Sequence, residues 1–207
     1  MRVKICGFTR ESDVRAALDA GVDALGFNLA RGPRRIAVER AAQLAALVPP
    51  LVQAVALFVD AGEEEILAAV AATRCTAVQL HGDEPPELAA RLRRRVPVIK
   101  AFRIVGAADL DRVRGYPADA FLLDASVAGA HGGTGIVWNH GLLAGRDLGA
   151  PVILAGGLTP ANVGAAVAAA RPWAVDTASG VESAPGLKDA ATMRAFVLAV
   201  AIPVSKR

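Results

Sequence analysis

The feature that most constrains this chain is a regular alternation of short apolar runs with stretches in which apolar residues have helical spacing. Eight apolar runs are expected to form strands: residues 3–6, 24–29, 55–59, 77–81, 98–102, 121–124, 152–155 and 174–177. Strict alternation of strands and helices predicts a parallel sheet with the helices packed outside it. Eight such units in one α/β chain predict closure into a single (β/α)8 TIM barrel rather than an open sheet.

Residues typical of helix starts follow several of these runs. Thr9 is a suitable N-cap for a first helix, since its side-chain oxygen can accept a hydrogen bond from a free backbone N–H group. Residues 63–65 are all glutamates, whose carboxylates stabilise the positive end of a helix dipole. Thr159 and Pro160 predict an N-cap and a first helical residue after the seventh run, and a weaker helix is expected around residues 107–114.

The composition indicates one domain and a small anionic ligand. No shift in composition marks a linker among the 207 residues, so we expect a single catalytic barrel domain spanning residues 1–207. Aromatic residues make up only 4% of the chain, which argues against nucleic-acid binding by base stacking. The formal net charge of +3 comes from scattered arginines and suits small anionic substrates. The densest basic cluster, residues 91–95, is interpreted as the solvated end of a helix.

Cysteine usage and hydropathy exclude several other classes of protein. Cys6 and Cys75 lie far apart without CxxC spacing, which fits neither a disulfide framework nor a zinc site. The first residues are too polar for a signal peptide, and the chain has no apolar run long enough for a membrane span. We therefore expect a cytoplasmic protein without a membrane partner, as a monomer or a homodimer.

The predicted barrel brings the ends of the strands together. Active sites of this fold lie at the carboxyl ends of the strands, so residues that end or follow the eight runs are expected to share one mouth. Asp124 ends an apolar run, where a carboxylate is costly to bury unless it is paired or does chemistry. The alternative interpretation of Asp124 is a solvated residue in a tight surface loop. The other expected mouth residues are Cys6, His81 and the basic loop 31–35.

Glycine-rich loops after the last three runs predict a phosphate site. Barrels of this kind commonly bind phosphate through backbone N–H groups in the loops after strands seven and eight. Glycine lets the backbone approach such an anion closely and adopt a positive φ angle. The residues expected to bind the phosphate are Gly156, Gly157, Ser179 and Gly180, together with Gly133, Thr134 and Gly135 in the loop after Asp124.

Six segments taken together resemble the phosphoribosylanthranilate isomerase family. They are KICG (residues 4–7), VQLHGDE (78–84), VIKAF (98–102), LLD with GGTG (122–124 and 132–135), ILAGGLTPANV (153–163) and VDTASGVESAPGLKD (175–189). The resemblance runs in order from Lys4 to Asp189. It implies an Amadori rearrangement in tryptophan biosynthesis, in which N-(5-phosphoribosyl)anthranilate becomes 1-(2-carboxyphenylamino)-1-deoxyribulose 5-phosphate. It also implies that the reaction uses neither a metal nor an organic cofactor.

The resemblance assigns the two proton transfers of this reaction. Asp124 matches the general acid of the family, which protonates the sugar ring oxygen as the ring opens. Cys6 matches the general base, which removes the C2 proton from the resulting Schiff base. An ordinary thiol is a poor base at neutral pH, so the Cys6 thiolate needs stabilising surroundings. Lys4, two residues earlier, is expected on the same face of the strand. Cys75 is interpreted as packing material.

The resemblance also implies an arginine that binds the anthranilate carboxylate. In the family this arginine comes from the loop after the second strand, where the present chain has a shorter loop without the usual serine. Arg34 aligns best because a proline precedes it, with Arg35 as the second candidate, and the choice stays open. A guanidinium suits the role because its planar fork matches a carboxylate.

The remaining polar residues near the expected mouth have more general roles. His81 is expected to line the mouth as a shaping or hydrogen-bonding group. Asp176 matches a family acid near the site, where it either orients catalytic groups or makes a purely structural hydrogen bond. His131 is interpreted as a surface residue and His140 as part of an outer helix. The three histidines lack the spacing of metal ligands, so no metal site is expected.

Three alternative functions make different demands on the sequence. A pentose-phosphate epimerase would need paired acids or metal-binding histidines at the strand ends. A non-catalytic phosphosugar-binding protein would need neither Cys6 nor Asp124. A bifunctional isomerase that also serves histidine biosynthesis is expected to carry an acid at the first strand, where this chain has Cys6. The residues favour the phosphoribosylanthranilate isomerase reaction.

Overall fold

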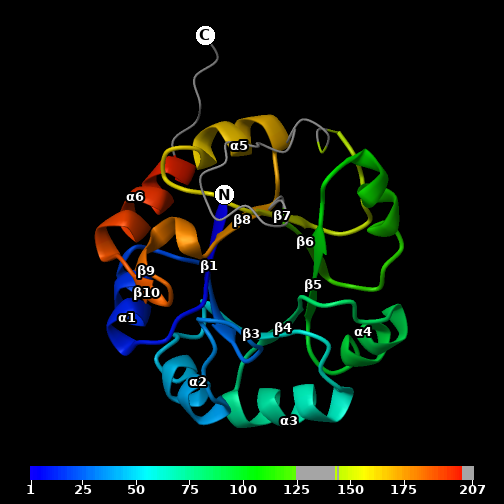
Figure 1. The fold of residues 1–207 in the computed structure, drawn as a ribbon, viewed down its shortest axis with the longest axis horizontal. Helices are drawn as coiled ribbons and strands as arrows, with labels where there is room; N and C mark the ends of the chain where they lie inside the picture. The colour runs from blue at the N-terminus through cyan, green and yellow to red at the C-terminus, as the bar shows by residue number, and fades with distance from the viewer. Residues whose placement is uncertain (125–142, 144, 202–207) are drawn as a thin grey trace.

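Eight parallel strands form a closed barrel in the computed structural model, which describes residues 1–124, 143 and 145–201 (Figure 1). The strands are β1 (Arg2–Cys6), β2 (Ala24–Asn28), β3 (Gln53–Phe58), β4 (Ala77–Leu80), β5 (Val98–Arg103), β6 (Ala120–Asp124), β7 (Val152–Ala155) and β8 (Ala174–Thr177). Each strand pairs with the next in the sequence, and β1 also pairs with β8, which closes the sheet. The predicted (β/α)8 barrel is thus confirmed.

Helices surround this barrel as an outer ring (Figure 1). The α-helices are α1 (Glu11–Asp19), α2 (Val38–Ala45), α3 (Glu63–Thr73), α4 (Pro86–Leu92), α5 (Val163–Ala170) and α6 (Ala190–Ala201). Short 3-10 helices, η1 (Ala107–Arg112) and η3 (Ser179–Val181), follow β5 and β8, and a small hairpin joins β9 (Glu182–Ala184) to β10 (Leu187–Lys188). Within the described part of the chain, no helix has the length and apolar character that crossing a membrane requires.

The hydrophobic core has two layers because side chains alternate between the two faces of each strand. One layer lies between the barrel and the helices and includes Ile5, Phe27 and Leu123, all without exposed surface. The second layer fills the barrel interior with residues such as Val55, Ala77, Ile99, Leu122 and Ala174. Small and branched aliphatic side chains dominate this interior, as is usual in a barrel of this kind.

The alternation also decides which polar residues lie inside the barrel. Lys4 and Cys6 lie on the inner face of β1, Gln79 on that of β4, and Asp176 on that of β8. Gln79 and Asp176 follow Ala77 and Ala174 of the apolar interior layer by two residues, so they lie closer to the carboxyl ends of their strands. Lys4, Gln79 and Asp176 are each less than 10% exposed. Polar side chains therefore gather toward the carboxyl ends of the strands, where the sequence predicted the mouth.

Two predicted helix starts are wrong. Helix α1 begins at Glu11, after an N-cap at Arg10, and the Thr9 hydroxyl instead donates a hydrogen bond to the backbone oxygen of Gly186 at 2.7 Å. Helix α5 begins at Val163 rather than at Pro160. Asn162 causes the delay, because its side chain accepts a hydrogen bond from the Thr159 N–H group at 2.8 Å and donates one to the Gly157 oxygen at 3.0 Å, which holds this segment as a turn.

Candidate active site at the mouth of the barrel

Cys6 lies at the carboxyl end of β1 with its side chain directed into the barrel. It is 7% exposed, and its strand neighbour on β2 is Gly26. A Cβ atom at Gly26 would lie only 2.6 Å from the Cys6 sulfur, closer than real Cβ contacts allow. The absence of a side chain at Gly26 therefore leaves the space that the thiol occupies. The position of the Cys6 sulfur thus requires a glycine at this point of the second strand.

A buried ion pair lies beside Cys6. Lys4 and Asp176 are register partners on β1 and β8, and the Lys4 Nζ donates to the Asp176 Oδ1 at 2.8 Å. Burial alone would lower the pKa of Lys4, but the Asp176 carboxylate and the Cys6 thiol raise it above its ordinary value. Lys4 is therefore a fixed cation next to the sulfur. As expected, it lies on the same face of β1 as Cys6.

The electrostatics of Cys6 combine two opposing effects. Burial raises the pKa of the Cys6 thiol, because the thiolate loses its hydration. The cations of Lys4 and Lys188 act in the other direction, and the Asp176 carboxylate adds to the effect of burial. A negative charge on the sulfur is thus supported mainly by these two lysines.

Asp124 and His81 lie across the barrel from Cys6, at the ends of β6 and β4. The His81 Nε2 lies 3.9 Å from the Asp124 Oδ2, and the two side chains are 35% and 25% exposed. Burial lowers the pKa of His81, while the Asp124 carboxylate opposes this shift. The Gln79 amide nitrogen lies 2.8 Å from the His81 Nδ1. Since an amide nitrogen can only donate, Nδ1 accepts, and a neutral His81 carries its proton on Nε2, facing Asp124.

A cavity of about 670 Å³ opens beside His81 and Asp124. Its wall includes Lys100, Phe102 and Arg103 from β5. This volume is within the range of small-molecule sites. A second cavity of about 570 Å³ lies at the opposite end of the barrel, next to Leu51 and Trp173, where this fold does not place catalysis.

The loops after β7 and β8 are fastened to each other. Gly156 and Gly157 have φ angles of 94° and 62°, which favour glycine. A Cβ atom at Gly180 would lie 1.8 Å from the Leu158 backbone oxygen, so only glycine allows this contact. The Thr177 hydroxyl also donates to that oxygen at 2.7 Å. The two loops predicted to bind phosphate are therefore adjacent, with Ser179 exposed in η3.

The third such loop, with Gly133, Thr134 and Gly135, lies outside the described residues, as do His131 and His140.

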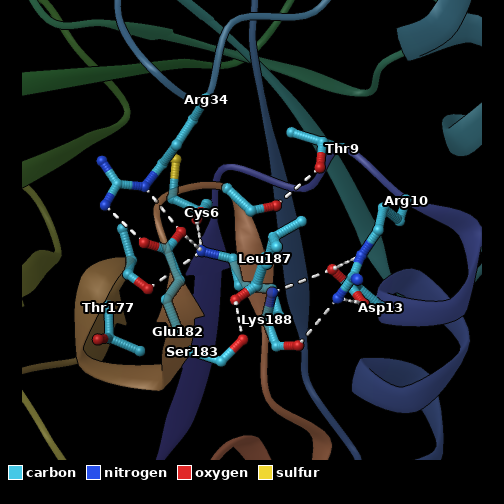
Figure 2. A network of polar contacts seen from close by, with 12 residues as sticks. Cys6, Thr9, Arg10, Asp13, Arg34, Thr177, Glu182, Ser183, Leu187 and Lys188 are labelled. Carbon is cyan, nitrogen blue, oxygen red and sulfur yellow. Dashed lines mark hydrogen bonds and ion pairs between the residues drawn. The ribbon is translucent and has the colours of Figure 1, made fainter.

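The two candidate arginines have different surroundings. Arg34 packs over Gly7, whose φ angle is 88° and at which a Cβ atom would lie 2.4 Å from the Arg34 Cδ. Its guanidinium donates to both carboxylate oxygens of Glu182, from Nε at 2.8 Å and from Nη2 at 2.6 Å (Figure 2). Arg35 is exposed. Arg34 is therefore the arginine that the structure holds next to Cys6.

Glu182 and Lys188 were not singled out from the sequence. The Lys188 Nζ donates to the Glu182 Oε1 at 2.7 Å and to the Cys6 backbone oxygen at 2.6 Å (Figure 2). Both side chains are almost completely buried, at 0% and 4% exposure. Glu182 and Lys188 are two of the four charged residues in segment 175–189, which is otherwise rich in small residues, and this was the available signal. No group of three or more potential metal ligands occurs among the residues that the structure describes.

The comparisons with known proteins agree with this arrangement. A family model described as N-(5'phosphoribosyl)anthranilate (PRA) isomerase matches residues 3–199. The N-(5'-phosphoribosyl)anthranilate isomerase of Myxococcus xanthus (strain DK1622) is 49% identical over 205 residues, which cover 96% of this chain and 95% of the relative.

Solved structures show the same similarity. The phosphoribosyl anthranilate isomerase of Thermotoga maritima matches with a TM-score of 0.92 at 37% identity, covering 97% of this chain and 98% of that chain. A structure of phosphoribosyl anthranilate isomerase in complex with reduced 1-(o-carboxyphenylamino)-1-deoxyribulose 5-phosphate has a TM-score of 0.88 at 36% identity, with the same coverage. The match over nearly the whole chain, in sequence and in fold, means that the protein belongs to the N-(5'-phosphoribosyl)anthranilate isomerase family.

Proposed function

We propose that this protein converts N-(5-phosphoribosyl)anthranilate into 1-(2-carboxyphenylamino)-1-deoxyribulose 5-phosphate, a step of tryptophan biosynthesis. The observation that carries the proposal is the placement of a carboxyl group, Asp124, and a thiol, Cys6, at strand ends on two sides of one barrel mouth. An Amadori rearrangement needs an acid and a base that act on neighbouring atoms of one bound sugar, and neither group is needed merely to bind an anion.

The first step is ring opening. Asp124 donates a proton to the ring oxygen of the sugar as the C1–O bond breaks, and the anthranilate nitrogen supplies the electron pair that forms the Schiff base. The proton on the His81 Nε2 faces Asp124 and stabilises the carboxylate left after this transfer. The lowered pKa of His81 supports this role, because it keeps the ring neutral at physiological pH.

The second step is removal of the C2 proton. The Cys6 thiolate takes this proton, and the electron pair of the C2–H bond moves to the C1–C2 bond as the Schiff base nitrogen is neutralised. The resulting enolamine then tautomerises to the ketone. Lys4 supports the thiolate, and we propose that Asp176 acts by holding Lys4 in place. Burial raises the pKa of the Cys6 thiol on balance, and the two lysines oppose this shift, so they support the thiolate that this step requires.

Two anionic groups of the substrate set its orientation. The backbone N–H groups of Gly156, Gly157, Ser179 and Gly180 bind the phosphate, together with those of Gly133, Thr134 and Gly135. Arg34 binds the anthranilate carboxylate, with Arg35 as the second candidate. Arg34 is favoured because its packing over Gly7 places it next to Cys6, whereas Arg35 is exposed.

The wider setting of the enzyme follows from the same reaction. We propose that residues 1–207 act as one catalytic domain, since the first and last strands pair with each other. The reaction involves no net redox change and no cofactor, and we propose a cytoplasmic enzyme that is a monomer or a homodimer. Sedimentation at several protein concentrations distinguishes these two states.

The test is turnover of freshly generated phosphoribosylanthranilate, followed by loss of its fluorescence. Native protein is expected to be active, and Cys6→Ser and Asp124→Asn are each expected to lose about two or more orders of magnitude in kcat, the usual contribution of such groups. Cys75→Ser, which removes the other buried thiol, is the matched control and is expected to keep full activity.

Three outcomes would contradict the proposal. Full activity of Cys6→Ser would remove Cys6 as the base, and full activity of Asp124→Asn would remove Asp124 as the acid. Native protein that binds the substrate without turnover would indicate a phosphosugar-binding protein instead.

A further inference from the structure

We infer that Glu182 and Lys188 are positioning residues, which lock the carboxylate-binding Arg34 and the Cys6 end of β1 into one fixed arrangement. The inference rests on the proposed function, because it concerns the residues assigned there to the base and to the substrate carboxylate. Glu182 and Lys188 both come from the β9–β10 hairpin, and neither side chain takes part in the proton transfers of the proposed reaction.

Lys188 connects three parts of the mouth. Its Nζ donates to the backbone oxygens of Cys6 at 2.6 Å and Ala178 at 3.0 Å, and to the Glu182 Oε1 at 2.7 Å. An ammonium group has three donors, and these contacts use all three. The ends of β1 and β8 are thereby bound to one buried cation.

The backbone of Lys188 is itself held in place by α1. Its N–H group donates to the Asp13 Oδ2 at 3.0 Å, and its carbonyl accepts from the Arg10 Nη2 at 3.2 Å. Arg10 also donates to both oxygens of Asp13, so that the three residues form one closed set of contacts (Figure 2). Since the anchor is formed outside the mouth, Lys188 does not depend on substrate for its position.

Glu182 transmits this position to Arg34. Its carboxylate accepts from one edge of the guanidinium, formed by Nε and Nη2. A guanidinium fork has five N–H donors, and this pair uses two of them. The terminal edge, formed by Nη1 and the second N–H of Nη2, is not used by Glu182 and matches a second carboxylate bidentately. Glu182 therefore fixes the direction in which Arg34 presents its terminal edge.

The charges of this cluster do not cancel. Arg34 and Lys188 are both cationic and share the single Glu182 carboxylate, which leaves an excess of one positive charge, whereas Lys4 and Asp176 cancel each other. Burial alone would raise the pKa of Glu182, but hydrogen bonds from Arg34 and Lys188 lower it, which keeps it ionised. The excess positive charge lies beside Cys6 and favours its thiolate.

The first experiment measures the effect of Glu182 on substrate binding. Glu182→Gln keeps the shape of the side chain but weakens its hold on Arg34, and we expect KM to rise on the order of tenfold with kcat changed much less, as for other outer-shell partners of a binding group. In the double variant with Arg34→Lys, KM is expected to equal that of Arg34→Lys alone. Additive effects, or a lower KM in Glu182→Gln, would overturn the inference, because a lower KM means that Glu182 competes with the substrate.

The second experiment needs no substrate. In a Cys75→Ser background, alkylation of Cys6 by iodoacetamide is followed as a function of pH, which reports the thiolate fraction. The charged groups that act on Cys6 within the described residues are Lys4, Asp176, Lys188 and Arg34. Lys188→Met is expected to slow alkylation at neutral pH about tenfold, the result of raising the thiol pKa by about one unit. Lys188→Arg is expected to restore most of the rate.

Arg15→Met removes an exposed cation from the outer face of α1 and is the matched control for loss of charge. Circular dichroism confirms that each variant is folded before alkylation. An unchanged alkylation profile in folded Lys188→Met would overturn the role of Lys188. Because this measurement uses only the thiol, it separates a failure of the inference from a failure of the proposed reaction.

Discussion

The two sides of the barrel mouth differ in how their charges are arranged. On the Cys6 side, Lys4, Lys188 and Arg34 lie near the sulfur and pair with two carboxylates, those of Asp176 and Glu182, within the described part of the chain. On the Asp124 side, the His81 Nε2 lies 3.9 Å from the carboxylate, burial lowers the pKa of His81 and keeps it neutral at physiological pH, and Gln79 is uncharged. One side thus favours a negative base, and the other presents a neutral donor to a carboxyl group.

Buried Lys100 is a cation near the mouth that joins chain segments, and its charge also helps to lower the pKa of His81. Its Nζ donates to the backbone oxygens of Gly82 and Ala101, at 2.7 and 2.9 Å, and lies 3.1 Å from the Glu84 Oε2. Glu84 in turn accepts from the N–H groups of Gly82 and Asp60. This pair joins the loops after β3 and β4 to strand β5. The charge asymmetry therefore comes from what each lysine contacts, not from the number of lysines.

The largest effect is expected from removing the buried cation on the Cys6 side. Lys4→Met leaves the Asp176 charge buried without its partner, which is expected to lower the free energy of unfolding by about 3–5 kcal/mol and to slow turnover as well. Urea denaturation measures the first effect, and fluorescence-detected turnover measures the second. Arg2→Met, on the same strand, removes a stacking contact with Trp173 and is expected to cost about 1 kcal/mol or less.

A double variant separates stability from electrostatics at the same position. In Lys4→Met with Asp176→Leu, both buried charges are gone, so most of the lost stability is expected to return. Turnover is not expected to return with it, because the cation next to Cys6 is still missing. If both stability and turnover returned, the charge of Lys4 would not be needed for catalysis. The two sides of the mouth would then not differ in how their charges support the reaction.

A smaller effect is expected from moving the thiol without changing any charge. Gly26→Ala places a Cβ atom 2.6 Å from the Cys6 sulfur, so the sulfur must shift. A misplacement of about 1 Å in a catalytic group is expected to lower kcat about a hundredfold. Gly62→Ala is the matched control, since a Cβ atom there meets nothing within 4 Å. Equal activity of the two variants would mean that the exact position of the base matters less than its charged surroundings.

The sequence predicted the fold well because each strand is a short apolar run that ends at a polar or glycine-rich segment. All eight predicted strands are present, with ends that differ by at most two residues from those observed. Helix starts were less predictable, because side chains that could cap a helix made other contacts, either local, as at Asn162, or distant in the sequence. Thr9 has the chemistry of an N-cap, yet its hydroxyl is bound to Gly186, 177 residues away.

The same reason limits what the sequence reveals about the site. Cys6 and Asp124 were found because the barrel rule places strand ends at the mouth, which requires only local information. The contact between Lys188 and Cys6 joins residues 182 positions apart, and no local pattern indicates it. Similarly, the alignment alone left Arg34 and Arg35 open, whereas packing over Gly7 distinguishes their surroundings. The roles of all these residues remain predictions that the variants above test.

The smallest effect concerns the neutral side of the mouth and the dependence of stability on pH. Burial lowers the pKa of His81 in the folded protein, whereas in the unfolded chain the imidazole titrates near its ordinary value of about 6.5. Between these two values the unfolded state binds more protons, so the free energy of unfolding falls as the pH drops below about 6.5. This loss is complete once the pH is below the folded pKa.

His81→Gln removes this contribution, since glutamine does not titrate. Urea denaturation between about pH 7.5 and 5.5 is therefore expected to show a shallower loss of stability in the variant than in the native protein. The difference is small because the His81 side chain is 35% exposed, so water screens part of the effect. A steeper loss in the variant would mean that His81 is stabilised as a cation by Asp124. In that case both sides of the mouth would hold positive charge, and the neutral donor assigned to His81 would have to be abandoned.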